Sequence, residues 1–112
     1  MYKVINMVLT RDFKQTIMER VNRDPAFAKA LLDEAVTLFF NDEPETARLV
    51  LRDLINATVG FETLALDTAK PSKSLHRMLT KAGNPSMDNL AAIFNAIQKN
   101  LGVKIQTRAV KI

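Results

Sequence analysis

Proline and glycine divide this chain into short segments with helical periodicity, and this punctuation limits what it can fold into. All four prolines and all three glycines fall near segment ends. Within the segments, apolar residues recur every three or four positions, as they do on the buried face of a helix. The expected fold is therefore mainly α, a compact bundle of about six helices. These helices are expected over about residues 11–23, 25–41, 44–60, 61–68, 72–82 and 87–101.

Capping residues support several of these boundaries. Asp24 precedes Pro25, which is the pattern of an N-cap followed by proline at the first helical position. Ser86 is expected to cap the last helix, and Gly102 follows its end.

The C-terminal residues have a different periodicity. Val103 and Ile105 alternate with Lys104 and Gln106, which is typical of a strand. Because a lone strand is not stable in water, we expect it to pair with residues 2–5 or with a second copy of the chain. A length of 112 residues suits one domain, 1–112. It would hold N-terminal helices (10–58), a helix-turn-helix region (60–101) and a short C-terminal β-strand (103–112).

The composition excludes several classes of function. Without cysteine there is no disulfide framework, no thiolate zinc site and no cysteine nucleophile, and a single histidine excludes a histidine-based metal cluster. The sequence has no nucleophile with an adjacent base and no phosphate-binding glycine loop. We therefore expect a protein that is not an enzyme and has no cofactor. The apolar runs are far shorter than a membrane span, so a cytoplasmic location is expected.

One acidic group invites a different interpretation. Asp42, Glu43 and Glu45 suggest a carboxylate metal site or a catalytic carboxylate pair. They also surround Pro44, at the expected start of a helix, where negative charge is favourable. We therefore interpret the group as helix capping and as compensation of the helix dipole.

Positive charge is concentrated in the second half of the chain. Residues 1–60 contain eight Lys or Arg and nine Asp or Glu, whereas residues 61–112 contain eight and three. No acid occurs between Asp67 and Asp88. A local positive field of this kind attracts polyanions, although a solvated helix face has the same appearance.

The spacing within this basic region favours DNA binding. A short helix (61–68), a brief connection and a second helix (72–82) form a helix-turn-helix candidate. Its inward residues would be Leu64, Ala65, Leu75, Met78 and Leu79. Arginine and lysine donate to guanine acceptors, and serine hydroxyls contact phosphates or bases. The candidate DNA-binding residues are Lys70, Ser72, Lys73, Ser74, His76, Arg77 and Lys81.

Aromatic residues do not suggest a single-stranded nucleic-acid platform. They occur at helical spacing, which indicates core positions, and the chain has no recognisable RNA-binding motif. The adjacent pair Phe39 and Phe40 is the exception, because neighbours cannot share one helix face. One of the two is therefore a candidate for an interface.

The same region resembles a known family. The runs are Gly60-Phe61-Glu62-Thr63-Leu64-Ala65, Pro71-Ser72-Lys73-Ser74-Leu75-His76-Arg77-Met78-Leu79 and Gly83-Asn84-Pro85 with Asn89-Leu90. Upstream runs are Leu9-Thr10-Arg11-Asp12-Phe13, Arg23-Asp24-Pro25-Ala26-Phe27 and Leu51-Arg52-Asp53-Leu54-Ile55-Asn56-Ala57. Together they resemble the addiction-module antidote proteins, HigA-like antitoxins with a Cro/C1-type (XRE) helix-turn-helix. Three positions depart from that family's pattern: Phe61, Ala69 and Leu79.

The resemblance implies a dimeric helical repressor that binds a palindromic operator in double-stranded DNA upstream of its own operon. It places Lys73, Ser74 and Arg77 on the recognition helix, with Ser72 and His76 on the same exposed face. Relatives often neutralise a RelE/ParE-like toxin. Our first hypothesis is therefore a sequence-specific regulator, the antitoxin of a type II toxin-antitoxin module. The alternative is a protein-interaction module that neutralises such a toxin with weak or no specific DNA binding.

Overall fold

The structure, a computed structural model, describes residues 19–20 and 24–112. Five α-helices lie between residues 24 and 112: α3 (Pro25–Phe40), α4 (Pro44–Ala57), α5 (Phe61–Thr68), α6 (Ser72–Met78) and α7 (Met87–Leu101). This arrangement confirms a mainly helical, compact fold. Of the helix expected over 11–23, only residues 19 and 20 are described, and both are helical. No helix in the described part of the chain is long and apolar enough to cross a membrane.

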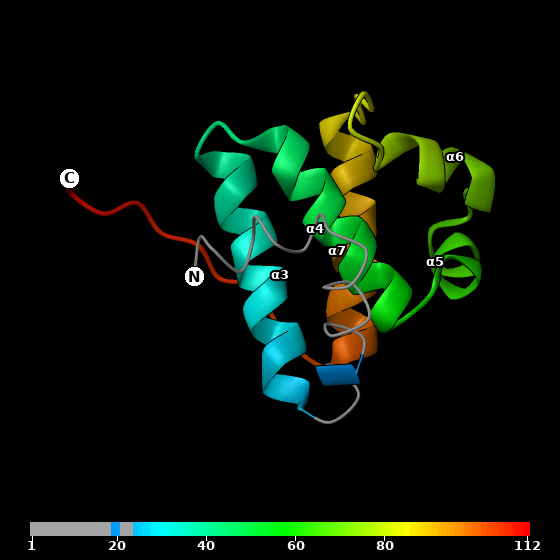
Figure 1. Cartoon of the computed structure of the whole chain (residues 1–112), viewed down its shortest axis with the longest axis horizontal. Helices are drawn as coiled ribbons and strands as arrows, with labels where there is room; N and C mark the ends of the chain where they lie inside the picture. The colour runs from blue at the N-terminus through cyan, green and yellow to red at the C-terminus, as the bar shows by residue number, and fades with distance from the viewer. Residues whose placement is uncertain (1–18, 21–23) are drawn as a thin grey trace.

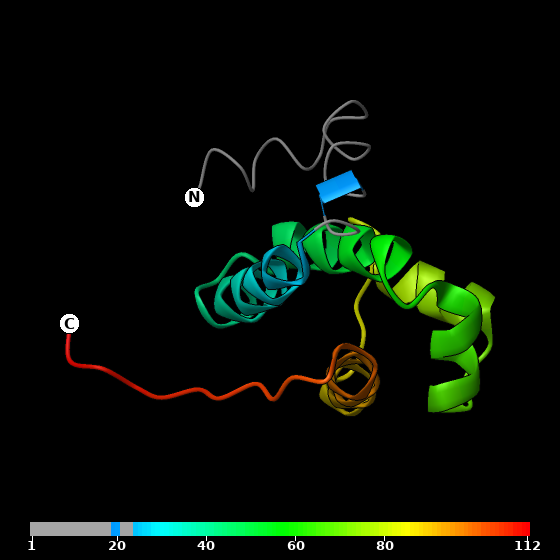
Figure 2. The same cartoon turned by 90° about the horizontal axis from the view of Figure 1, so that it is seen from below.

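The helices are arranged around α4 and α7. Helix α3 packs on α4, and α5 contacts both α6 and α7. As a result, α3 and the C-terminal segment lie on one side of the molecule, and the α5–α6 pair lies on the other (Figures 1 and 2). The two ends of the molecule therefore present separate surfaces.

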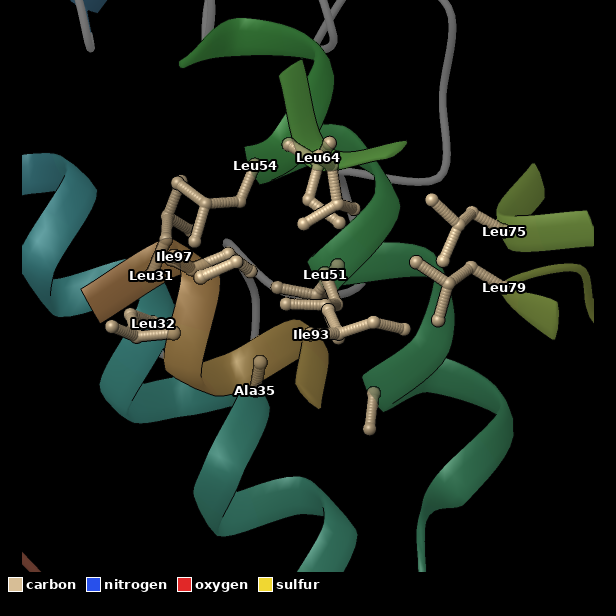
Figure 3. Packing of buried hydrophobic residues seen from close by; sticks show 14 of the residues in the cluster. Leu31, Leu32, Ala35, Leu51, Leu54, Leu64, Leu75, Leu79, Ile93 and Ile97 are labelled. Atoms are coloured by element: carbon tan, nitrogen blue, oxygen red, sulfur yellow. The ribbon is translucent and has the colours of Figure 1, made fainter. Parts of the chain in front are cut away.

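One hydrophobic cluster joins all five helices. Leu75 in α6 and Leu79 just after it point from one side toward Leu51 and Ile93 (Figure 3). Burial of each such side chain contributes about 1.5–3 kcal/mol. The fully buried large residues are Leu32, Leu51, Leu54, Ile55, Leu64, Leu75, Leu79, Ile93 and Ile97.

Most of the expected helix caps are present. The Asp24 carboxylate accepts a hydrogen bond from the Ala26 N–H at 3.1 Å, and Pro25 begins α3. The Ser86 hydroxyl accepts one from the Asn89 N–H at 3.1 Å, and Gly102 follows α7 with a left-handed φ of 65°.

The acidic group before α4 differs from its expected role. Glu43 occupies the N-cap position, but its side chain makes no capping hydrogen bond, so the capping interpretation is wrong for this residue. Glu45 lies in the first turn of α4, where its negative charge interacts favourably with the positive end of the helix dipole. In the part of the chain that the structure describes, no His, Cys, Asp or Glu cluster could hold a metal ion.

The C-terminal strand is not formed in the single chain. Residues 103–112 have no regular secondary structure, and no other described residue forms a strand. The start of this segment makes two hydrogen bonds to Gln98. The Gln98 backbone carbonyl accepts from the Val103 N–H at 3.1 Å, and the Gln98 side-chain oxygen accepts from the Ile105 N–H at 2.7 Å. An extended segment becomes a strand only when another segment completes its hydrogen bonds. Residues 2–5, one of the two expected partners, lie outside the described residues.

Candidate nucleic-acid interface

A three-residue connection joins α5 to α6. At its start Ala69 has a left-handed backbone, with φ 55° and ψ 38°. The following N–H, of Lys70, donates to the Ala65 carbonyl at 3.2 Å and closes the end of α5. Pro71 is extended and begins the first turn of α6 as its N-cap. The connection requires a conformation that glycine adopts freely, and the chain has alanine there.

Helix α6 has one buried and one exposed face. Leu75 is fully buried in the core. Lys73, His76 and Arg77 are exposed, and their spacing of three and four residues places them together on the opposite face. Three of the predicted residues therefore form one cationic surface, which we call the α6 face: Lys73, His76 and Arg77.

The other predicted residues surround the α6 face rather than belong to it. Ser72 and Ser74 are half-buried on α6, and Lys70 is half-buried in the connection. Lys81 is exposed, but it lies in the turn after α6 rather than on the helix. Its placement differs because α6 ends at Met78, whereas the periodicity predicted a helix over 72–82.

His76 has an aromatic partner that the sequence pattern did not indicate. Its ring stacks on Phe61, the first residue of α5, with centroids 3.8 Å apart and planes 20° apart. Phe61 is itself buried, so it forms a fixed platform beneath one side of the imidazole. The contact joins the start of α5 to the exposed face of α6.

A buried arginine holds the chain just after α6. Arg48 is only 8% exposed in α4. Its Nε donates to the Thr80 carbonyl at 2.9 Å, and a terminal nitrogen donates to the Lys81 carbonyl at 2.7 Å. If the helix continued, the N–H for the Lys81 carbonyl would come from Pro85, which has none. Arg48 therefore supplies the Lys81 carbonyl with a hydrogen bond that a longer α6 would lack.

Gly83 permits the chain to turn back at this point. A Cβ atom at Gly83 would lie 2.3 Å from the Met78 carbonyl oxygen and 2.8 Å from that of Arg77. Cβ atoms essentially never come this close to other atoms, so only glycine fits this approach to the end of α6 without a shift of the backbone. The need for glycine at position 83 thus has a steric cause, the close approach of its backbone to the end of α6.

A side-chain hydrogen bond joins α5 to α7. The Asn100 side-chain amide donates to the Asp67 carboxylate at 2.9 Å and to the Ala96 carbonyl at 2.9 Å. Helix α5 is thereby held at its C-terminal end by α7. The position of the α6 face is thus set by three contacts. Arg48 of α4 holds the chain after α6, Phe61 of α5 stacks on His76, and α7 holds the end of α5.

The sequence analysis missed both the role of Arg48 and the contact of Phe61 with His76, for different reasons. A signal for Arg48 exists, because it lies three residues before Leu51 on the apolar stripe of α4, where a charged side chain needs a buried partner. The contact of Phe61 with His76 leaves no trace in the spacing, since it joins two helices across a turn.

The positive charge of the α6 face can attract an anion. It presents three nitrogen-bearing side chains in a stretch of sequence without acids. Comparison of the chain with family models, curated proteins and solved structures finds no match in any of the three.

Proposed function

We propose that the protein is a sequence-specific DNA-binding regulator in which α5 and α6 act as a helix-turn-helix. The α6 face carries this proposal, because it exposes Lys73, His76 and Arg77 while Leu75 holds the opposite side in the core. An α-helix with its side chains is about 10–12 Å in diameter, which fits a major groove about 12 Å wide.

The proposal gives the cationic residues two kinds of role. Lys73 and Arg77, on the exposed face, would donate to base edges in the major groove. Lys70 and Lys81, at either end of α6, would neutralise phosphates and position the helix. The hydroxyl groups of Ser72 and Ser74 would donate hydrogen bonds to phosphates or bases. His76, stacked on Phe61, would also contact the DNA.

The test is a binding titration with two duplexes, the DNA upstream of the protein's own gene and a random duplex of equal length. Each titration is carried out at two salt concentrations. We expect a preference for the upstream DNA that persists at the higher salt, together with a lower affinity for both duplexes at that salt concentration. Equal, strongly salt-dependent binding to both duplexes would contradict sequence-specific recognition.

Variants on the α6 face make the test specific. Arg77→Ala should cost about 1–3 kcal/mol on the upstream DNA and much less on the random duplex, because a base contact contributes only at the right sequence. The matched control is Lys29→Ala, an exposed cation on α3 at the other end of the molecule. An equal loss on both duplexes would assign Arg77 to a phosphate instead.

A second role, neutralisation of a toxin, is favoured by the acidic surface near the start of α4. Asp42, Glu43 and Glu45 are all exposed, and they complement a basic partner such as an RNA-cleaving toxin. We include this role in the proposal, with the protein as an antitoxin that represses its own operon. Co-purification with the product of an adjacent reading frame tests it. Replacing the three acids by lysine should abolish the complex, whereas Glu62→Lys on α5 should not.

A further inference from the structure

A pocket of about 350 Å³ lies where three helices meet. Its walls are the start of α3, the end of α4 with the residues just after it, and the end of α7 with Val103. Helix α3 begins and α7 ends at the same end of the molecule (Figure 1). The volume is typical of small-molecule sites, which measure about 300–1000 Å³. The lining includes none of the α6 face, so the pocket is a separate site.

The lining combines apolar side chains with a few polar groups. Among the nine described residues that line the pocket, Lys29 of α3 is the only charged one. The uncharged polar residues are Thr58 and Asn100, and the Thr58 hydroxyl already donates to the Leu54 carbonyl at 2.6 Å. The rest of the lining is apolar: Pro25, Ala28, Ala57, Val59, Leu101 and Val103. A lysine beside a mostly apolar pocket complements an anion that has an apolar body.

Asn100 connects this pocket to α5. Its side-chain amide uses both N–H groups, donating to the Asp67 carboxylate and to the Ala96 carbonyl at 2.9 Å each. An anion held by Lys29 would compete with the Asp67 carboxylate for the same amide. Its negative charge would also repel that carboxylate. Ligand binding is therefore expected to release the C-terminal end of α5 from α7.

The pocket also adjoins the start of α5. Val59 is part of the lining, and Gly60, with a left-handed φ of 79°, leads directly into α5. The first residue of α5, Phe61, is the one that stacks on His76 of the α6 face. A ligand in the pocket thus lies beside the connections at both ends of α5.

We propose that this pocket binds a small carboxylate with an apolar body, and that the bound ligand weakens DNA binding by the α6 face. Lys29 pairs with the carboxylate, the Asn100 amide exchanges Asp67 for it, and the apolar lining contacts the rest of the ligand. The ligand site does not depend on the proposed function, whereas its effect on DNA rests on it. Because coupling between two sites is reciprocal, DNA must weaken ligand binding by the same factor.

The first experiment is calorimetric titration of the full chain, without DNA, with octanoate and with benzoate. The two probes distinguish an aliphatic from an aromatic carboxylate, and at least one should bind at one molecule per chain. The corresponding amides, octanamide and benzamide, should bind about tenfold more weakly or worse, because they lack the charge that pairs with Lys29.

Variants assign the binding to the pocket. Lys29→Ala should raise the dissociation constant about tenfold or more, because the carboxylate loses its charged partner. The control is Lys99→Ala, which removes an exposed cation on α7 outside the lining and should leave the dissociation constant within about twofold. Circular dichroism checks folding, which is expected because both lysines are exposed.

Three results would overturn the ligand site. One is the absence of binding by either carboxylate, which is the result if residues 1–18 of the same chain occupy the pocket. Another is equal binding of carboxylates and amides, since the site would then not select an anion. The third is an equal effect of the Lys29 and Lys99 substitutions.

Nuclear magnetic resonance tests the connection to α5 without DNA. The bound carboxylate should shift the side-chain amide signals of Asn100 and the backbone amide signal of Asp67, because their hydrogen bond is exchanged. Unchanged Asn100 side-chain signals in the presence of saturating carboxylate would contradict the exchange.

The effect on DNA is measured by repeating the titration of the upstream duplex with saturating carboxylate. The affinity of the wild type should fall about fivefold or more. Asp67→Ala leaves the lining intact but removes the bond that the ligand exchanges, so its DNA affinity should change less than about twofold on adding the carboxylate. Glu62→Ala, at another exposed acid of α5, should respond like the wild type.

The outcomes separate the two proposals. If the wild type prefers the upstream DNA and bound carboxylate leaves that affinity unchanged, the regulation is refuted while the proposed function stands. If the wild type shows no such preference, the proposed function fails, and calorimetry and magnetic resonance still decide the ligand site.

Discussion

Replacing Arg48 by methionine should destabilise the protein and loosen the end of α6. Methionine retains much of the apolar stem of arginine but cannot donate hydrogen bonds. The Thr80 and Lys81 carbonyls would both lose their bonds from the guanidinium. The substitution therefore isolates the polar part of the contact from its packing.

The magnitude follows from what each carbonyl retains. A hydrogen bond from a charged donor contributes about 1.5–3 kcal/mol. The Thr80 carbonyl keeps a second bond, from the Gly83 N–H at 3.0 Å, so its loss is partial. The Lys81 carbonyl keeps none from the described residues. We expect a total of about 3 kcal/mol, or a fall in Tm of about 10–15 °C for a domain of this size.

Urea denaturation followed by circular dichroism measures this loss. The control is Arg52→Met on the same helix, because Arg52 is half-buried and makes no hydrogen bond to the described residues. It should change stability by about 0.5 kcal/mol or less. Arg48→Lys should fall between the two, since one ammonium cannot reproduce the planar fork. Equal effects at positions 48 and 52 would refute the assigned role of Arg48.

Two further predictions concern the backbone around α6. Gly83→Ala should lower the free energy of unfolding by about 1–3 kcal/mol, because its Cβ would collide with the Met78 carbonyl, whereas Asn84→Ala should stay within about 0.5 kcal/mol. A neutral Gly83→Ala in urea denaturation would show that the turn relaxes freely. Ala69→Gly should raise the Tm, because relief of a left-handed alanine is worth about 1–2 kcal/mol and the greater entropy of unfolded glycine offsets only part of it. A lower Tm would mean that the turn tolerates alanine without strain.

Several features of the fold were predictable because they depend on neighbouring residues. The start of α3 at Pro25 and the cap at Ser86 depend on side chains two or three positions from the backbone groups they bond. The range predicted for α5, 61–68, matches the structure because the segment is bounded by Gly60 and by the turn at Ala69. The prediction that Leu79 belongs to the core is likewise confirmed.

The candidate site was predictable only in part. Helical spacing placed Lys73, His76 and Arg77 together, because positions three and four apart share a face in any α-helix. The predicted length of α6 was wrong. The apolar periodicity continues through residue 82, whereas the helical hydrogen bonds do not, and α6 ends at Met78. Residues 103–112 do not form the predicted strand in the single chain, because alternation indicates an extended backbone, whereas strand formation needs a partner.

The amino-acid sequence alone determined the helical class, most helix boundaries, the core face of α6 and the concentration of positive charge around it. These properties follow from periodicity and capping, which act over a few residues. Only the tertiary structure decided where α6 ends and what lies beneath His76. Arg48 reaches a carbonyl 32 residues away, and Phe61 meets His76 across a turn. Contacts between elements depend on how whole helices pack, and packing is a property of the complete core rather than of any local pattern.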